Sequence, residues 1–357
     1  MKKTIYSLLL FSLLPCLVLN LFGCSIPHGK NEPKIHSKII SYAHFNTASQ
    51  IFAYGDISDE QFESYVTTAN ETLEYYHKLF DIYYEYSGVN NVKTINKNAG
   101  IAPVAVDREL IDFLSYCKEL YTLTNGKTNV MLGSVLKIWH NAREEAESDF
   151  GYLSPDSLPR ADELEAAGDH TSIDSLVINE DECTVYISDP EASLDVGAVA
   201  KGYTVDILYN KLKNAGADSV VLNIGGNIRT IGVKPDGSLW TSGITNPDKT
   251  SENSLICRVT IGESSVVTSG DYERYFISGD KKYNHIVDPE TLMPAEYFAS
   301  VSIVTSESGL ADALSTALFC MPYESGLALL ESIGDADAIW IYKDGTLKTT
   351  SGISLAG

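Results

Sequence analysis

The chain has 357 residues, 44% of them hydrophobic, so it is long enough and apolar enough to bury a substantial core. Its formal net charge is −22, from 48 acidic and 26 basic side chains. This balance argues against a nucleic-acid partner, because a polyanion needs a basic face, and any phosphate ligand must be held locally by a metal ion, a lysine or backbone amides.

Residues 1–23 have the pattern of a bacterial export signal. An apolar run over residues 5–19 follows two lysines, and Leu21-Phe-Gly-Cys24 resembles a lipobox. Cleavage before Cys24 would leave a lipidated cysteine that anchors the mature protein to the extracytoplasmic face of the bacterial cell membrane. The alternative is a short membrane anchor that is never cleaved. Residues 24–38 are polar, contain two prolines and are predicted to form a tether.

The folded body is predicted to span residues 39–357 as one domain, because no break in composition divides it. A hairpin is predicted within residues 39–56. The first helix is predicted to begin at the capping box Ser58-Asp-Glu-Gln61. Apolar side chains at helical spacing predict helices over residues 58–79, 110–121, 133–140, 161–167, 198–215, 311–320 and 323–333.

The remaining pattern is that of short strands. Residues 80–96 and the acidic interval 141–170 are predicted to be largely irregular, apart from the short helix at 161–167. From residue 175 onward, several apolar runs are joined by glycine-containing turns that favour antiparallel pairing. Strands are predicted over residues 175–178, 184–188, 193–196, 219–224, 228–233, 239–244, 255–261, 274–277, 283–287, 299–305 and 338–342. The predicted fold class is therefore α+β, with mixed, largely antiparallel sheets packed with helices.

Four cysteines fall in this body: Cys117, Cys183, Cys257 and Cys320. They form no C-x-x-C pair and have no histidine nearby at the spacing of a zinc site. We predict that they are buried as small hydrophobic side chains, and the sequence leaves their disulfide status open.

The stretch Ser193–Asp206 passes from an apolar run to a helix through glycine. The carboxylate of Asp195, the lone cation Lys201 and the tight backbone at Gly197 suit a site that holds an anionic ligand near a strand end. The alternative is structural, with Gly197 in an ordinary turn and Lys201 on a solvated helix face.

A magnesium site is predicted from a set of side-chain and backbone oxygen atoms. Asp312 and Thr316 are four residues apart on a predicted helix and therefore share a face. Together with Asp195 and backbone carbonyls near Ala198 they offer only hard oxygen ligands, which Mg²⁺ prefers alongside substrate phosphates. A bound cation would also offset the repulsion between an acidic protein and a diphosphate. The alternative for Asp312 is a helix N-cap.

His285 precedes Asp288-Pro289 at the end of a predicted strand. A neutral imidazole can take a proton from a hydroxyl nucleophile near pH 7, so His285 is a candidate general base. The alternative is a hydrogen-bonded structural histidine. No Gly-x-Ser-x-Gly elbow and no His-Glu-x-x-His is present, which excludes common hydrolases and zinc proteases.

Taken together, these stretches resemble the FAD:protein FMN transferase (ApbE-type) family from about Phe45 to Tyr342. The motifs that carry the resemblance are Leu194–Asp206, Asn223–Asn227, Thr268–Tyr272 with Arg274, His285–Pro289 and Ala311–Thr316. Two positions depart from the usual family pattern. Gly126-Lys-Thr-Asn129 stands where members often read Gly-x-Phe-Asp, and Thr291-Leu292 replaces the usual Thr-Gly.

The resemblance implies a T-fold-like domain that uses Mg²⁺ to transfer FMN from FAD to a threonine or serine hydroxyl of a membrane-associated partner protein, with release of AMP. It implies that FAD contacts Phe45, Tyr83, Lys127, Thr128, Asn129, Asp195, Lys201 and Val287. It places the metal among Ala198, Asp312, Ser315 and Thr316, with His285 and Asp312 as catalytic residues. Two alternatives stay open: a metal-dependent FAD pyrophosphatase, and a flavin-binding or solute-binding lipoprotein without turnover.

Overall fold

A computed structural model describes residues 34–356. The predicted export signal, the predicted lipidation site Cys24 and most of the predicted tether lie outside the described residues. Strand β1 begins at Ile35, so the predicted boundary at residue 39 is wrong by four residues. The strand buries only the side chain of His36, and it therefore shows no apolar alternation that would reveal it in the sequence.

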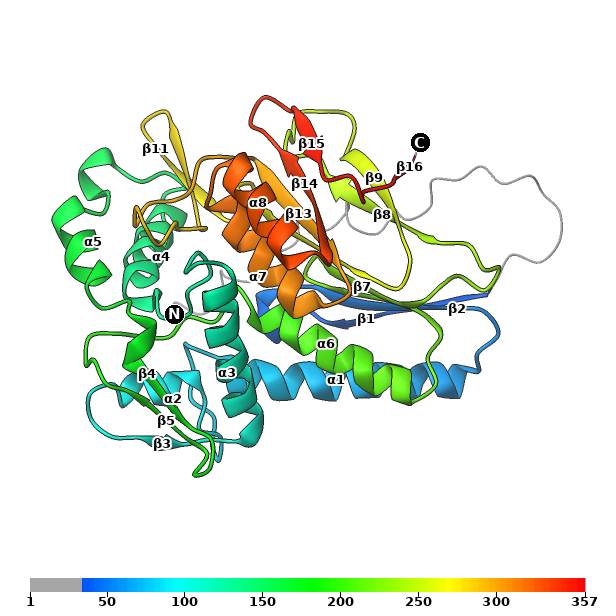
Figure 1. Ribbon diagram of the computed structural model, residues 1–357, viewed down its shortest axis with the longest axis horizontal. Coiled ribbons are helices and arrows are strands. Elements are labelled where there is room, and N and C mark those ends of the chain that lie inside the picture. Colours follow the sequence, from blue (N-terminus) through cyan, green and yellow to red (C-terminus); the bar gives the residue numbers. More distant parts are fainter. Residues whose placement is uncertain (1–33, 357) are drawn as a thin grey trace, which may run out of the picture.

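An eight-stranded sheet forms the centre of the molecule, in the order β1-β2-β6-β7-β10-β13-β14-β15 (Figure 1). Its strands are β1 (Ile35–Ser41), β2 (Ser49–Tyr54), β6 (Ser219–Ile224), β7 (Asn227–Gly232), β10 (Ser265–Gly270), β13 (Ser300–Thr305), β14 (Ala336–Ile341) and β15 (Leu347–Thr349). Each neighbouring pair in it is antiparallel. The predicted hairpin is confirmed as β1–β2, and the predicted antiparallel α+β class is confirmed with it.

Three smaller sheets, also antiparallel, complete the strands. They are β8 (Trp240–Thr245) with β9 (Leu255–Ile261) and β16 (Leu355–Ala356), β11 (Tyr275–Ser278) with β12 (Lys281–Asn284), and β3 (Val104–Ala105) with β5 (Thr184–Ile187) and β4 (Leu176–Asn179). The helices are α1 (Asp59–Phe80), α2 (Val92–Lys97), α3 (Arg108–Leu123), α4 (Gly133–Glu147), α5 (Ala161–Gly168), α6 (Ala200–Asn214), α7 (Ser308–Phe319) and α8 (Tyr323–Ile333), with short 3-10 turns η1 (His44–Asn46), η2 (Pro155–Ser157) and η3 (Ile173–Ser175).

Alternation along β2 explains how both faces of the central sheet are covered. Ile51 and Ala53 pack against α1 and α6 in one cluster, whereas Phe52 packs with β8 and β9 in another. Successive strand side chains point to opposite faces, so one strand serves both cores. Figure 1 shows α1 and α6 running side by side along the sheet, with α7 against α6 and α8 against α7.

Several predicted elements needed correction. Residues 80–96 are not wholly irregular, because Asn91 and Thr94 form a capping box that begins α2. α4 continues to Glu147, into the interval predicted to be irregular. The predicted strand 193–196 is only an isolated bridge at Ser193, and β10 was missed altogether.

None of the described helices is both long and apolar enough to span a membrane. Within the same residues, the four cysteines of the body carry free thiols. Cys117 and Cys320 are buried as predicted. Cys183 and Cys257 are only partly buried, which corrects the prediction for that pair.

Candidate active site

One cavity of about 2390 Å³ brings together nearly all of the residues predicted to form a site. Its walls include Phe45, Tyr83, Lys127, Thr128, Asn129, Asp195, Ala198, Lys201, His285, Val287, Asp312 and Thr316. These residues are spread over more than 250 positions of the chain, so the tertiary fold alone assembles them. Ser315 is the exception, since it does not line this cavity.

The start of α6 and the first turns of α7 meet at Asp312. The carboxylate of Asp312 accepts a hydrogen bond from the Gly202 N–H at 2.9 Å, and Lys201 Nζ lies 3.5 Å from both carboxylate oxygens. Asp312 is therefore not the N-cap of its helix, a position that belongs to Glu307. The contact joins the two stretches that the sequence analysis singled out for a phosphate-binding and a metal-binding role.

Gly202 permits this close approach. A Cβ at this position would overlap the Ser308 carbonyl oxygen and come within 2.8 Å of the Asp312 Cβ. We expect Gly202→Ala to push α6 and α7 apart, to lower the free energy of unfolding by about 1–3 kcal/mol, and to displace the Asp312 carboxylate. Thermal unfolding together with an activity assay measures both effects.

Gly262→Ala is the matched control for that substitution, because a Cβ there meets only Leu239 at 3.9 Å. It should leave both stability and activity near the wild-type values. Equal stability of the two variants would show that the α6–α7 contact tolerates a methyl group.

Only some of the residues predicted to surround the metal face the cavity. Asp312, Thr316 and the turn at Ala198 do so. Ser315 is fully buried behind them, where its hydroxyl donates to the Asp312 carbonyl oxygen at 2.9 Å and pairs with Ser269 Oγ at 2.8 Å. The prediction that Ser315 ligates the metal from the cavity is therefore not supported by its position, because its hydroxyl is already engaged within the core.

The remaining donors have the chemistry that Mg²⁺ prefers. No group of three or more His, Cys, Asp or Glu side chains able to hold a metal occurs among residues 34–356. The set at Asp312 is instead one carboxylate, the Thr316 hydroxyl and backbone carbonyls near Ala198. One or two carboxylates completed by substrate phosphates is a usual Mg²⁺ environment, so these residues fit the ion.

Asp195 lies in the turn that leads into α6. Its N–H donates to the Val130 carbonyl at 2.8 Å, and its carboxylate accepts the Gly197 N–H at 2.9 Å. Burial raises the pKa of Asp195 above its ordinary value, although the Gly197 N–H and cations including Arg274 act in the opposite direction. The side chain is thus held at the cavity wall by local hydrogen bonds, as the glycine turn predicted.

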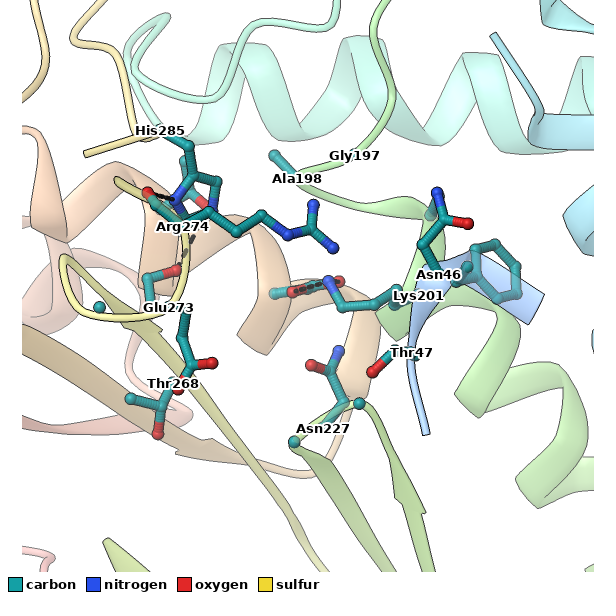
Figure 2. Close-up of a pocket in the computed structure, with 18 of the residues that line it drawn as sticks. Asn46, Thr47, Gly197, Ala198, Lys201, Asn227, Thr268, Glu273, Arg274 and His285 are labelled. Atoms are coloured by element: carbon teal, nitrogen blue, oxygen red, sulfur yellow. Dashed lines mark hydrogen bonds and ion pairs between the residues drawn. The ribbon is translucent and has the colours of Figure 1, made fainter. Parts of the chain in front are cut away.

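His285 faces the same cavity, with its ring held against the backbone of Arg274. Its Nδ1 lies 3.2 Å from the Arg274 carbonyl oxygen, and its backbone N–H donates to that oxygen at 3.1 Å (Figure 2). Because a carbonyl oxygen can only accept, Nδ1 carries the proton in this arrangement, and the lone pair of the neutral ring is on Nε2. Burial, followed by the charges of Arg274 and Arg143, lowers the pKa of His285 to about 3. The imidazole is therefore neutral at pH 7.

Two arginines that the sequence analysis did not assign complete this side of the cavity. Arg143, on α4, contacts His140 Nδ1 at 2.7 Å and lies 3.6 Å from Glu147. Arg274 extends its guanidinium into the space between Ala198 and Lys201 (Figure 2). Arg274 belongs to one of the family motifs, and this was the only feature of the sequence that indicated a role for it. Arg143 lies in an interval that was predicted to be irregular, and no pattern marked it.

Phe45 and Asn46 form a turn with strained backbone at another wall of the cavity. Both are non-glycine residues with positive φ, 54° and 52°. Such backbone costs about 1–3 kcal/mol and persists only where neighbouring groups hold it. Here the Phe45 N–H donates to His77 Nδ1 at 3.3 Å, and the two rings lie edge to face at 5.7 Å. His77 therefore holds the turn that presents Phe45.

We expect His77→Leu to weaken FAD binding by about tenfold, because loss of one hydrogen bond of about 1 kcal/mol and of the ring contact releases the Phe45 turn. His77→Asn should retain most of the affinity, since its amide oxygen can accept the same N–H. Titration of each variant with FAD, followed by flavin fluorescence, tests this. Equal affinities of the Leu and Asn variants would contradict the role of the acceptor atom.

The remaining predicted FAD contacts reach the cavity with side chains that are already engaged. Lys127 Nζ pairs with Asp288 at 2.8 Å, Thr128 Oγ1 donates to the Ala313 carbonyl at 2.7 Å, and the Asn129 amide donates to Thr171 at 2.9 Å. Val287 is buried in a core cluster. These residues shape the wall, whereas Tyr83 is half exposed and packs on His140 with ring centroids 5.5 Å apart.

Several known proteins are similar to this chain in sequence. The FAD:protein FMN transferase of Klebsiella pneumoniae (strain 342) is 32% identical over 256 residues, which are 71% of this chain and 76% of that protein. The protein of the same name from Treponema pallidum (strain Nichols) is 33% identical over 271 residues, 72% of each chain.

Solved structures show the same architecture. The flavin transferase ApbE from Vibrio cholerae superposes with a TM-score of 0.72 at 26% identity, covering 90% of this chain and 97% of that one. An ApbE protein from Thermotoga maritima gives 0.74 at 24% identity, with the same coverage, and supports the fold. The model of the ApbE family matches residues 45–340, most of the chain. This chain belongs to the ApbE family.

Proposed function

We propose that this protein transfers FMN from FAD to a serine or threonine hydroxyl of an acceptor protein, with AMP as the leaving group. The observation that carries the proposal is the meeting of Asp312, Lys201 and the Asp195 turn in the cavity that His285 also faces. The related transferases from Klebsiella pneumoniae and Treponema pallidum support the same reaction.

In this reaction, the residues of the chain position the diphosphate and neutralise its charge. Mg²⁺, held by Asp312, Thr316 and backbone oxygen near Ala198, would neutralise the diphosphate as a Lewis acid. Lys201 lies beside these donors and can bind a phosphate oxygen. Phosphoryl transfer depends chiefly on such positioning and charge neutralisation.

His285 would accept the proton of the attacking hydroxyl. Its Nε2 carries the free lone pair while Nδ1 is bonded to the Arg274 carbonyl oxygen. The three cations that depress the pKa of His285 are Arg274, Arg143 and Lys201. A bound diphosphate offsets these charges, so FAD binding is expected to raise the pKa of His285 toward its ordinary value and to make it a stronger base.

The proposal includes a cellular location for the protein. The lipobox predicts a lipid anchor at Cys24, outside the described residues, and an acceptor that is a membrane-associated redox protein on the extracytoplasmic side. Incorporation of labelled lipid into the wild-type chain and its loss in Cys24→Ala would support the anchor. Equal labelling of both chains would reject it.

The reaction itself is tested by incubating the protein with FAD, Mg²⁺ and a candidate acceptor. The expected result is flavin fluorescence that remains with the acceptor after denaturation, together with one AMP released for each FMN attached. Free FMN and AMP without labelled acceptor would indicate a pyrophosphatase instead. FAD recovered intact in the presence of Mg²⁺ would indicate a binding protein without turnover.

A further inference from the structure

Arg274 occupies a fixed position at the edge of the cavity, in the turn before β11. Its carbonyl oxygen accepts both the backbone N–H of His285 and the hydrogen bond from the His285 ring. The backbone is therefore tied to the candidate general base. The side chain extends away from this contact into the space between Ala198 and Lys201 (Figure 2).

Three other cations that line the cavity are paired with carboxylates. These pairs are Lys127 with Asp288 at 2.8 Å, Lys201 with Asp312 at 3.5 Å and Arg143 with Glu147 at 3.6 Å. The guanidinium of Arg274 makes no hydrogen bond and no ion pair with any residue in the range 34–356. In a chain with 48 acidic and 26 basic side chains, an unpaired cation that faces a cavity is available for an anionic ligand.

The charge of Arg274 reaches the groups that surround the cavity. It lowers the pKa of His285. At Asp195 and Tyr83, where burial raises the pKa, the charge of Arg274 lowers it in opposition to burial. Those three side chains come from three separate parts of the chain. The charge of the guanidinium therefore acts on titratable groups from several walls of the cavity.

We propose that Arg274 binds the diphosphate of the dinucleotide and stabilises the charge that develops when the diphosphate is cleaved. A guanidinium presents paired donors that match two phosphate oxygens, which a lysine cannot do. The proposal rests on the proposed function. Its ligand class is a dinucleotide with a bridging diphosphate, and it assigns to this chain a phosphate-binding residue besides Lys201.

FMN transfer forms one bond to phosphorus and breaks another. The acceptor hydroxyl oxygen forms a bond to the phosphorus on the FMN side, and its proton passes to His285. The bond from that phosphorus to the bridging oxygen breaks, and its electron pair leaves with the AMP phosphate. Negative charge grows on the leaving phosphate in this step, so donors already directed at the diphosphate favour the transition state over the ground state.

The test compares Arg274→Gln and Arg274→Lys with the wild-type protein. Arg160→Gln is the matched control, because Arg160 is exposed, pairs with Asp162 at 2.6 Å and does not line the cavity. We expect Arg274→Gln to lower kcat for FMN transfer by about 10²- to 10³-fold, the usual cost of one transition-state donor, and FAD affinity by about tenfold. Arg274→Lys should recover part of kcat, and Arg160→Gln should change neither quantity. Transfer by Arg274→Gln within threefold of the wild-type rate would overturn the proposal.

A second measurement separates phosphate binding from a structural role and from failure of the proposed function. FAD and riboflavin are titrated against each protein, since riboflavin carries the same ring without phosphate. Weaker binding of FAD but unchanged binding of riboflavin in Arg274→Gln supports the phosphate contact, even if the wild-type protein transfers no FMN. Equal loss of both ligands, or loss of neither, overturns it.

Discussion

Asp312→Ala is expected to reduce Mg²⁺-dependent FMN transfer by about 10³-fold or more. The carboxylate is the only anionic donor among Asp312, Thr316 and the backbone oxygen near Ala198, and a Lewis-acid contribution of several kcal/mol corresponds to a loss of this size. The rate of acceptor labelling at saturating FAD, measured over a series of Mg²⁺ concentrations, gives the effect. Wild-type activity with an unchanged Mg²⁺ dependence would reject the metal assignment.

Asp312→Asn separates this effect from damage to the fold. In the wild-type protein the buried carboxylate accepts the Gly202 N–H at 2.9 Å, so alanine leaves that donor unpaired at a cost of about 1–3 kcal/mol. Asparagine keeps an acceptor oxygen but loses the charge. We expect Asp312→Asn to unfold nearer the wild-type temperature than Asp312→Ala and to be equally impaired in transfer.

His285→Ala is expected to slow transfer by about 10²- to 10⁴-fold, the usual contribution of a general base. FAD binding should change by only a few-fold, because the ring uses its Nδ1 on the Arg274 carbonyl oxygen and leaves Nε2 for the acceptor hydroxyl. Single-turnover labelling and FAD titration measure the two quantities separately. Equal losses in both would indicate a structural histidine.

The control for that experiment is His170→Ala. His170 contacts Asp189 at 2.7 Å outside the cavity, and this hydrogen bond raises its pKa. Its removal should leave transfer unchanged. A fall in activity as large as that of His285→Ala would mean that the assay reports stability instead of chemistry.

Elements with strong local patterns could be predicted from the sequence. The predicted bounds of β6, β9 and α8 match the structure, because each has an apolar period that its own residues complete. β10 could not be predicted in this way. Its second half is polar, and its hydroxyls are satisfied across the fold, Thr268 by Ser302 at 2.7 Å and Ser269 by Ser315 at 2.8 Å.

The candidate site, too, could be predicted only in part. Asp195, Lys201 and Asp312 were predicted to be site residues from their chemistry and from the family motifs that contain them. The spacing of Ser315 from Asp312 could not show that its hydroxyl faces Ser269, because residues three and four apart share a helix face. Nor could the sequence show that the guanidinium of Arg274 extends into the space between Ala198 and Lys201 (Figure 2).

The antiparallel α+β class, most of the helices and the residue types that can hold a dinucleotide and a cation could be predicted from the order of the amino acids. Which of those residues reach the cavity, and which are engaged elsewhere, depends on how the folded elements pack. The two kinds of information differ in the distance along the chain over which they act. Helical and strand periods reflect neighbours within a few residues, whereas the Gly202–Asp312 contact joins groups 110 positions apart and depends on how α6 and α7 pack.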